Sequence, residues 1–323
     1  MQRAFPRSDA HSTTEVSENR LEHVAHDWWR VARRWLFRAV VYLILADVGF
    51  VFLFPVIYMV TTSFKSAEDL NDPTVVWLAS GLSSVTQNYV YAFKALDMLL
   101  SGRNSIEISV ISAVLQTVSC GVVGYAFARI PFPGRGPLFA VVLLTFLVPP
   151  ETIIVPLFIL YKNLGWIDDV YYRPFIVPSM FAMGLKGPLF IMIYRQFFRG
   201  MPYELEDAGR IDGAGAFKTF WFIMLPLARP AMLVTFLFSL VWHWNDYFEP
   251  LIYLNRTQFF TLPMRLSALG QSLNDVTNGQ GSEFYNEAFT MAACFLVITP
   301  ILVIYLFTQR YFVTSIDRTG LVE

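Results

Sequence analysis

Six long apolar stretches constrain this chain more than any other feature of its sequence. Each provides about the 20 residues that an α-helix needs to cross roughly 30 Å of hydrocarbon. Lipid offers no partners to backbone polar groups, so apolar segments of this length are expected to form helices. The stretches are residues 39–62, 106–128, 137–160, 174–198, 227–254 and 288–309. The sequence therefore predicts an all-α, polytopic membrane protein with six transmembrane helices.

Composition agrees with a membrane location, since 55% of the 323 residues are hydrophobic and the mean hydropathy is +0.48. A net charge of −1 and the lack of a basic run argue against a nucleic-acid partner. We expect residues 1–38 to form a cytoplasmic tail and an interfacial helix, because "WWRVARRWLFR" interleaves aromatic and basic residues. Residues 39–309 form the predicted membrane domain. Residues 310–323 form a predicted cytoplasmic tail, disordered without a partner because it lacks apolar periodicity.

Basic residues predict the orientation of these helices. With the amino terminus inside, the inner segments contain thirteen basic residues and the outer segments seven, so an arrangement with both termini in the cytoplasm is favoured. The inner set is Arg30, Arg33, Arg34, Arg38, Arg129, Arg135, Arg195, Arg199, Arg210, Lys218, Arg229, Arg310 and Arg318. The outer set is Lys65, Lys94, Arg103, Lys162, Arg173, Arg256 and Arg265.

Residues 199–226 form a polar interruption that this orientation places in the cytoplasm. Pro202 and the acidic residues after it suit the first turn of a helix that ends near residue 211. Gly213 and Gly215 permit a sharp turn, and a second helix then ends before Pro226. One face of that second helix is apolar, with Phe217, Phe220, Trp221 and Met224. Such an elbow either rests on lipid headgroups or presents small residues to another protein.

The pattern in this elbow resembles the EAA loop of membrane subunits of ATP-binding-cassette importers. It consists of "DAG" at 207–209, Gly213, Ile223 and "LP" at 225–226. The resemblance is to the carbohydrate-uptake branch, of the maltose-system type, and covers nearly the whole chain. Other segments that carry it are "FPVIYMVTTSFKS", "GYAFARIPFPGRG", "YRQFFRGMP", "WHWNDYFEPLI" and "QRYFV".

The resemblance implies a type I importer permease fold in which the elbow docks into a cleft of an ATPase subunit. The docking positions it implies are Glu206, Asp207, Ala208, Gly209 and Gly213, whereas Phe217, Phe220 and Trp221 would pack the elbow onto its own membrane domain. The motif has Glu where this chain has Asp207 and Ala where it has Gly209.

The partners implied are a second homologous permease, an ATPase dimer and an extracytoplasmic sugar-binding protein. All would lie at a bacterial or archaeal cytoplasmic membrane. The chain has no GxxxxGK[ST] phosphate loop, so ATP and Mg²⁺ would be bound by the ATPase partners, and the chain itself is not an enzyme. No cofactor or metal is expected, since Cys120 and Cys294 lack metal-ligand spacing. The outer loop 255–286 would face the binding protein, with Asn274, Asp275, Asn278 and Gly279 as contact candidates.

Charged and aromatic residues within the apolar stretches are candidates for a solute path, because a charge at mid-bilayer needs a partner or a cavity. Glu151 follows the Pro149–Pro150 break and Lys186 is expected at mid-depth. Either residue contacts solute, or Lys186 pairs with Glu151 or Asp47. Further path candidates cluster in the fifth stretch and are Trp242, Trp244, Asn245 and Asp246, which could equally belong to an interfacial aromatic belt.

Three other functions remain open at this point. Asp47 and Asp246 could form an intramembrane aspartyl protease dyad, but no "GxGD" setting or HExxH motif is present. An ion-coupled secondary transporter could use Glu151, Lys186 and Asp246. Neither the protease nor the secondary transporter needs an ATPase-docking elbow. The elbow therefore favours a sugar importer permease. The third is a permease of the same kind for a solute that is not a sugar.

Overall fold

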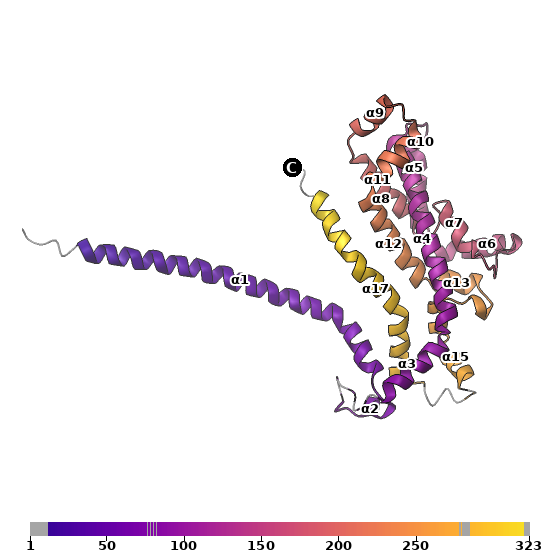
Figure 1. The fold of residues 1–323 in the computed structure, drawn as a ribbon, viewed down its shortest axis with the longest axis horizontal. Coiled ribbons are helices and arrows are strands. Elements are labelled where there is room, and N and C mark those ends of the chain that lie inside the picture. The colour runs from indigo at the N-terminus through magenta and orange to yellow at the C-terminus, as the bar shows by residue number, and fades with distance from the viewer. Residues whose placement is uncertain are drawn as a thin grey trace, which may run out of the picture. The chain divides into compact units, whose positions relative to one another are not determined.

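The computed structural model describes residues 12–319 except 76, 78, 80, 82, 278 and 280–284 (Figure 1). The chain divides into two compact units, Met1–Met59 and Val60–Glu323, which are considered separately. The residues described are mostly helical and contain no β-strand.

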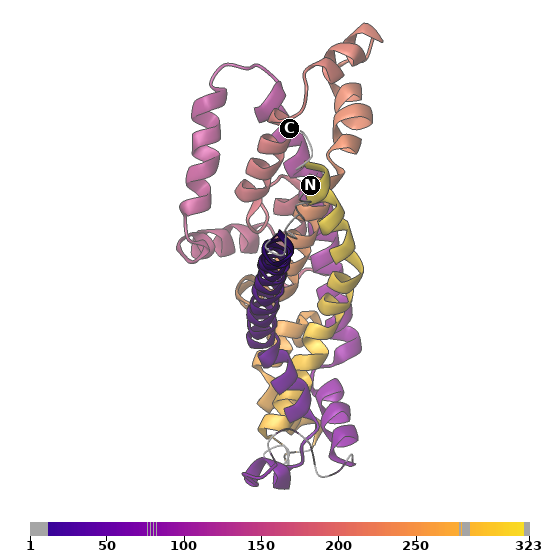
Figure 2. The same ribbon diagram turned by 90° about the vertical axis from the view of Figure 1, so that its left-hand side faces the viewer.

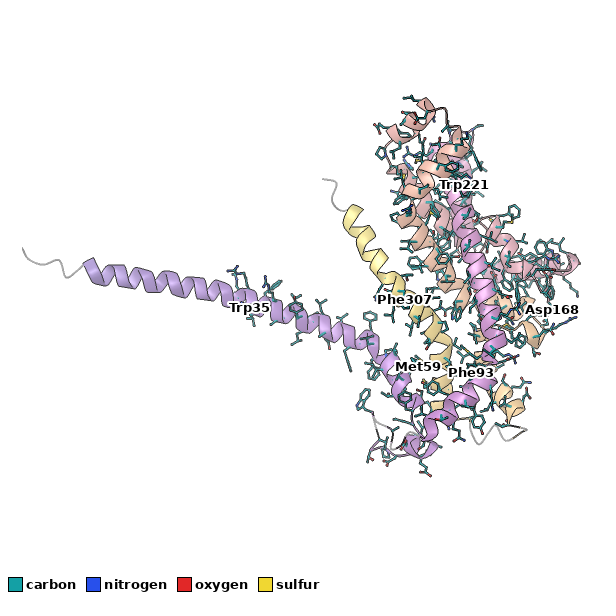
Figure 3. The ribbon with its side chains drawn as sticks, in the orientation of Figure 1. Trp35, Met59, Phe93, Asp168, Trp221 and Phe307 are labelled. Carbon is teal, nitrogen blue, oxygen red and sulfur yellow. The ribbon has the colours of Figure 1, made fainter. Side chains whose placement is uncertain are left out.

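The first unit consists of the amino-terminal part of helix α1, Ser12–Ser63. The basic segment predicted as an interfacial helix is continuous with the apolar stretch that follows it. Side chains from residue 33 onward are mostly apolar and exposed, and Trp35, labelled in Figure 3, is 65% exposed. Residues 33–63 are long and apolar enough to cross a membrane.

The second unit contains two helices that also meet this test, α4 (Met98–Arg129) and the 287–309 part of α17 (Glu287–Thr319). Helix α17 continues to Thr319, so the prediction of a disordered tail is wrong for residues 310–319. Shorter helices complete the unit. They are α2 (Ala67–Asn71), α3 (Ser83–Ala95), α5 (Arg135–Leu147), α6 (Pro150–Asn163), α7 (Arg173–Met180), α8 (Gly187–Arg199), α9 (Glu204–Ile211), α10 (Ala216–Thr219), α11 (Leu225–Leu227), α12 (Arg229–Asn245), α13 (Phe248–Tyr253), α14 (Leu262–Ser267) and α15 (Leu269–Val276).

The remaining predicted membrane helices are broken. Helices α5 and α6 meet at 98° at the Pro149–Pro150 pair that the sequence marks as a break. The bend between them is visible in Figure 2. The fourth stretch is two helices, α7 and α8, separated by residues 181–186, and the fifth ends α12 at Asn245 before α13. Among the described residues, three helices could cross a membrane. The number rises to five if two bent pairs each count as one span: α5 with α6, and Ala216–Leu227 with Arg229–Asn245, which are bent by 78°. The prediction that the fourth and fifth stretches each form one unbroken helix is therefore wrong.

Helix α4 is the centre of the second unit, packing against α7, α8 and α12 (Figure 1). Its buried face carries small and hydroxyl residues, which allow helices to approach closely in a membrane protein. At Gly124, for example, an added Cβ would lie 2.5 Å from Tyr194 Cβ. Polar groups on this face bond across helices: Gln116 Nε2 donates to the Leu185 carbonyl at 2.8 Å, and Ser239 Oγ donates to Gln116 Oε1 at 2.7 Å. These bonds fix α4 to both α12 and the 181–186 break.

The turn at 181–186 gives a prediction about stability. A Cβ added at Gly187 would lie 2.2 Å from the Ala182 carbonyl oxygen, a backbone atom that cannot rotate away. We expect Gly187→Ala to lower the free energy of unfolding by about 1–3 kcal/mol, the usual cost of overpacking. Thermal unfolding in detergent measures this change. The control is Gly136→Ala in α5, where no heavy atom lies within 4 Å of an added Cβ; an equal loss in both variants would contradict the packing argument.

Candidate functional site

The elbow between α8 and α12 has the backbone that the sequence predicts. Helix α9, Glu204–Ile211, ends in a turn at Gly213, whose φ is +79°. The Gly213 amide donates to the Arg210 carbonyl at 3.0 Å, and the Ala214 amide donates to the Gly209 carbonyl at 2.8 Å. This pair of bonds is the Schellman arrangement, which satisfies carbonyls at the end of a helix and needs a left-handed residue at the glycine position. A second arm then follows: α10, a π-helical turn over Phe220–Met224, and α11.

One side of the elbow packs on the membrane helices. Phe220 and Met224 are buried in the core formed with Tyr125, Tyr194 and Phe198. Phe220 therefore packs the elbow onto its own domain as predicted, and Trp221, labelled in Figure 3, is half-buried against the same core.

Two of the predicted docking positions also face inward. Glu206 is only 4% exposed, and its Oε1 lies 3.4 Å from Nε of Arg129, the last residue of α4. Gly209 is buried, and an added Cβ would lie 2.8 Å from Cδ1 of Ile223 in the second arm. Both residues therefore hold the elbow together from inside, so their prediction as surface contacts is wrong. The sequence could not reveal this, because the buried partner of Glu206 is 77 positions away.

The other side of the elbow is exposed. Asp207 and Ala208 lie on it as predicted, and Asp207 makes only an exposed ion pair with Arg210 at 3.4 Å. Ile211 is 87% exposed one turn after Asp207, and Phe217 is 75% exposed. The prediction that Phe217 packs onto the membrane domain is therefore wrong. We call Asp207, Ala208, Ile211 and Phe217 the outward residues of the elbow.

The elbow and the rest of the second unit can now be compared with known proteins. Residues 120–318 match the family described as the binding-protein-dependent transport system inner membrane component. This match covers more than half of the chain and includes α4 from Cys120, the elbow and α17. The chain belongs to this family.

Relatives and a solved structure agree with the assignment. The chain is 31% identical over 278 residues to the arabinooligosaccharides transport system permease protein of Halalkalibacterium halodurans, covering 85% of this chain and 93% of that one. It is 29% identical over 293 residues to the protein of the same name from Bacillus subtilis, covering 88% and 96%. Its fold matches a crystal structure of a bacterial ABC transporter involved in alginate import, with a TM-score of 0.70, 22% identity and coverage of 86% and 96%. The protein is thus an importer permease with the fold of that structure.

A cavity of about 380 Å³ lies among the broken helices of the same unit. Its wall comes from the α5–α6 bend, α7, the 181–186 break, α12 and α13. Aromatic rings dominate one part of it. Tyr161 and Tyr253 meet edge to face with ring centroids 5.1 Å apart, and the ring centroids of Phe175 and Tyr253 are 5.8 Å apart. Its amine, imidazole and carboxyl side chains are Lys186, His243 and Glu249. Aromatic faces beside a few polar groups are typical of sites for small solutes.

Of the predicted path residues, Lys186 alone lines this cavity, with Nζ 5.8 Å from the Phe146 ring centroid. No ion pair joins Lys186 to Glu151, which is exposed at the start of α6 beside the cavity wall. Asp47 belongs to the first unit and Lys186 to the second.

The four residues predicted in the fifth stretch do not line the cavity. Trp242 packs between Phe190 and Phe238, and buried Trp244 donates its indole N–H to the Val297 carbonyl at 3.2 Å. Asp246 Oδ1 accepts the Phe248 amide at 3.1 Å, and Asn245 is exposed at the end of α12. His243 and Glu249 belong to the same polar block of the fifth stretch and do line the cavity. Tyr253 was missed, because only the packing of α13 against α6 and α7 brings it to the cavity.

The predicted binding-protein contacts lie at the opposite end of the unit from the elbow (Figure 1). Asn274 and Asp275 are exposed in the last turn of α15, and Gly279 is exposed with φ +91°. Asn278 lies outside the described residues. Up to Val276 the loop is held on the unit, because the apolar side of α15 buries Leu269 and Leu273 against α3 and α17.

Proposed function

We propose that this chain is one of two permease subunits of an importer that takes up a sugar, driven by ATP hydrolysis in an ATPase dimer. ATP and Mg²⁺ would be bound by the ATPase subunits, and the solute would be delivered by an extracytoplasmic binding protein. The second permease would be a homologous chain. The sugar class rests on the names of the relatives, which transport arabinooligosaccharides.

The outward residues of the elbow carry the proposal. Asp207, Ala208 and Ile211 are exposed on α9 and Phe217 is exposed on the second arm, so the described residues leave apolar and acidic side chains of both arms uncovered. Apolar side chains exposed together indicate a protein contact. With the elbow in the cytoplasm, this contact would be the ATPase, and both termini would also be cytoplasmic. The basic-residue distribution supports this orientation.

Purifying the chain with its expected partners tests the proposal. A tagged chain is expected to retain the ATPase and the second permease in detergent. Reconstituted with the binding protein, the complex should hydrolyse ATP faster when the right sugar is added from a panel of arabinose-, glucose- and galactose-containing oligosaccharides. A complex without ATPase would refute the permease role. Stimulation by a solute that is not a sugar would keep that role and refute the sugar class.

We also propose that the cavity beside Lys186 belongs to the solute path. The Lys186 ammonium can donate to hydroxyl or carboxylate oxygens, and bonds to charged groups contribute about 1.5–3 kcal/mol. Lys186→Ala should therefore raise the KM for uptake by roughly tenfold or more. Lys186 has φ +57°, and alanine keeps the Cβ, so both side chains carry similar backbone strain there.

Initial uptake rates into proteoliposomes at varied sugar concentration measure that KM. The matched control is Lys162→Ala, an exposed lysine at the end of α6 that does not line the cavity. An unchanged KM in Lys186→Ala, with normal ATPase activity in both variants, would remove Lys186 from the path.

A further inference from the structure

Arg129 connects three parts of the second unit at one buried point. It is the last residue of α4, and its side chain is completely inaccessible to solvent. Its Nε donates to the Phe198 carbonyl at 2.9 Å, and its Nη2 donates to the Met201 carbonyl, so it binds the end of α8 and the connector that follows. The guanidinium also stacks on Tyr203, with Cζ 4.2 Å from the ring centroid.

The third part is the elbow, through Glu206. Arg129 Nε lies 3.4 Å from Glu206 Oε1, and this is an ion pair without a hydrogen bond because Nε already donates to Phe198. Glu206 Oε1 and Arg129 Nη1 are both buried and have no hydrogen-bond partner among the residues that the structure describes. Both residues line a cavity of about 160 Å³ together with Arg210 and Thr219. Room and unused bonding capacity are therefore present where the elbow meets α4.

Packing alone does not explain this arrangement. A buried ion pair is weak evidence for stability, since apolar residues of similar volume are often as stabilising in its place. Helix α9 packs mainly on the second arm of the elbow, so the Glu206 contact is its polar link to α4. Thirteen residues back along α4, roughly 20 Å at 1.5 Å per residue, Gln116 binds the carbonyl of Leu185 beside the 380 Å³ cavity.

We propose that Arg129 and Glu206 are positioning residues that make the elbow and α4 move as one body, so that displacement of the docking elbow reaches the 181–186 break. This inference rests on the proposed docking of the elbow to an ATPase. The pair touches neither solute nor ATP. Its effect is expected in the number of ATP molecules hydrolysed per solute imported.

A double variant separates this role from a structural one. Arg129→Met alone leaves Glu206 buried without a counter-charge and is expected to impair assembly. Arg129→Met with Glu206→Gln removes both charges, so the complex should again assemble with its ATPase. We expect this assembled double variant to hydrolyse roughly tenfold more ATP per solute, which corresponds to a loss of about 1.4 kcal/mol of coupling. A purely structural pair predicts recovery of assembly and coupling together.

The measurement is ATP hydrolysis and solute uptake by the complete complex in the same proteoliposomes. The control is Glu107→Gln, which breaks the exposed Arg103–Glu107 ion pair of 2.7 Å and should leave the ratio unchanged. A double variant with the wild-type ratio would overturn the inference. If the double variant does not assemble, Glu206→Asp is measured instead, because it keeps the charge but shortens the link by one methylene. A raised ratio of ATP hydrolysed per solute in Glu206→Asp supports the inference, and an unchanged ratio overturns it. A wild-type chain that never retains ATPase would instead refute the proposed function.

Discussion

Gly213→Val is expected to reduce uptake by at least roughly tenfold while the chain still inserts in the membrane. Gly213 has φ +79° at the end of α9, a conformation in which a β-branched side chain meets the backbone. A non-glycine residue held there costs about 1–3 kcal/mol, and 1.4 kcal/mol is a factor of ten in an equilibrium. The elbow would relax by losing the Ala214-to-Gly209 bond, which sets the angle between its two arms. Uptake of labelled solute, compared at equal amounts of membrane-inserted chain, measures the effect.

Gly215→Val provides a matched control two residues further along. Gly215 has φ −70° and ψ 168°, which valine adopts readily, and no heavy atom lies near an added Cβ at either glycine. The two variants therefore add the same side chain to exposed positions of one turn and differ in backbone conformation. Equal uptake by both would show that the left-handed turn is not required. Gly213→Asn should retain more activity than Gly213→Val, because asparagine tolerates this conformation.

The elbow was predictable because its signals are local. Pro202, the acidic first turn, Gly213 and Pro226 lie within 25 residues, and each acts on the backbone next to it. The direction of its side chains was not predictable to the same degree. Helical spacing placed Phe217 and Phe220 on one apolar face, and the resemblance implied that both pack on the membrane domain. The second arm continues as a π-helical turn, and Phe217 faces solvent while Phe220 is buried.

The cavity and the Arg129–Glu206 pair depend on contacts between distant parts of the sequence. Lys186 was found because a lone charge in an apolar stretch is conspicuous. His243 and Glu249 lie in the block "WHWNDYFEPLI", where neither stands out from the polar groups beside it. The broken fourth helix has a local signal, since "GLKGP" combines two glycines with a proline that cannot donate in a helix. Hydropathy averages over such a break and predicts one continuous span.

Asp207→Lys is expected to detach the ATPase or abolish its coupling to uptake. Asp207 is exposed on the elbow, and among the described residues it pairs only with Arg210, which is exposed too. Lysine at this position would place a second cation beside Arg210 and reverse the charge presented to the ATPase. Like charges placed together in an interface cost several kcal/mol, so the affinity for the ATPase should fall by at least roughly 100-fold. Co-purification at equal chain amounts, followed by ATPase assays with binding protein and solute, measures both effects.

The control for Asp207→Lys must change the net charge by the same amount at a place that no ATPase can reach. Glu68→Lys does this, because Glu68 is an exposed acid in the first turn of α2, at the opposite end of the unit from α9 (Figure 1). Under the proposed orientation α2 lies outside the cell, so this variant should retain its ATPase and its coupling. Wild-type behaviour of both variants would mean that the outward residues rest on lipid headgroups rather than on an ATPase. Loss of the ATPase from Glu68→Lys alone would reverse the proposed orientation, since the cytoplasmic contact would then lie at the α2 end.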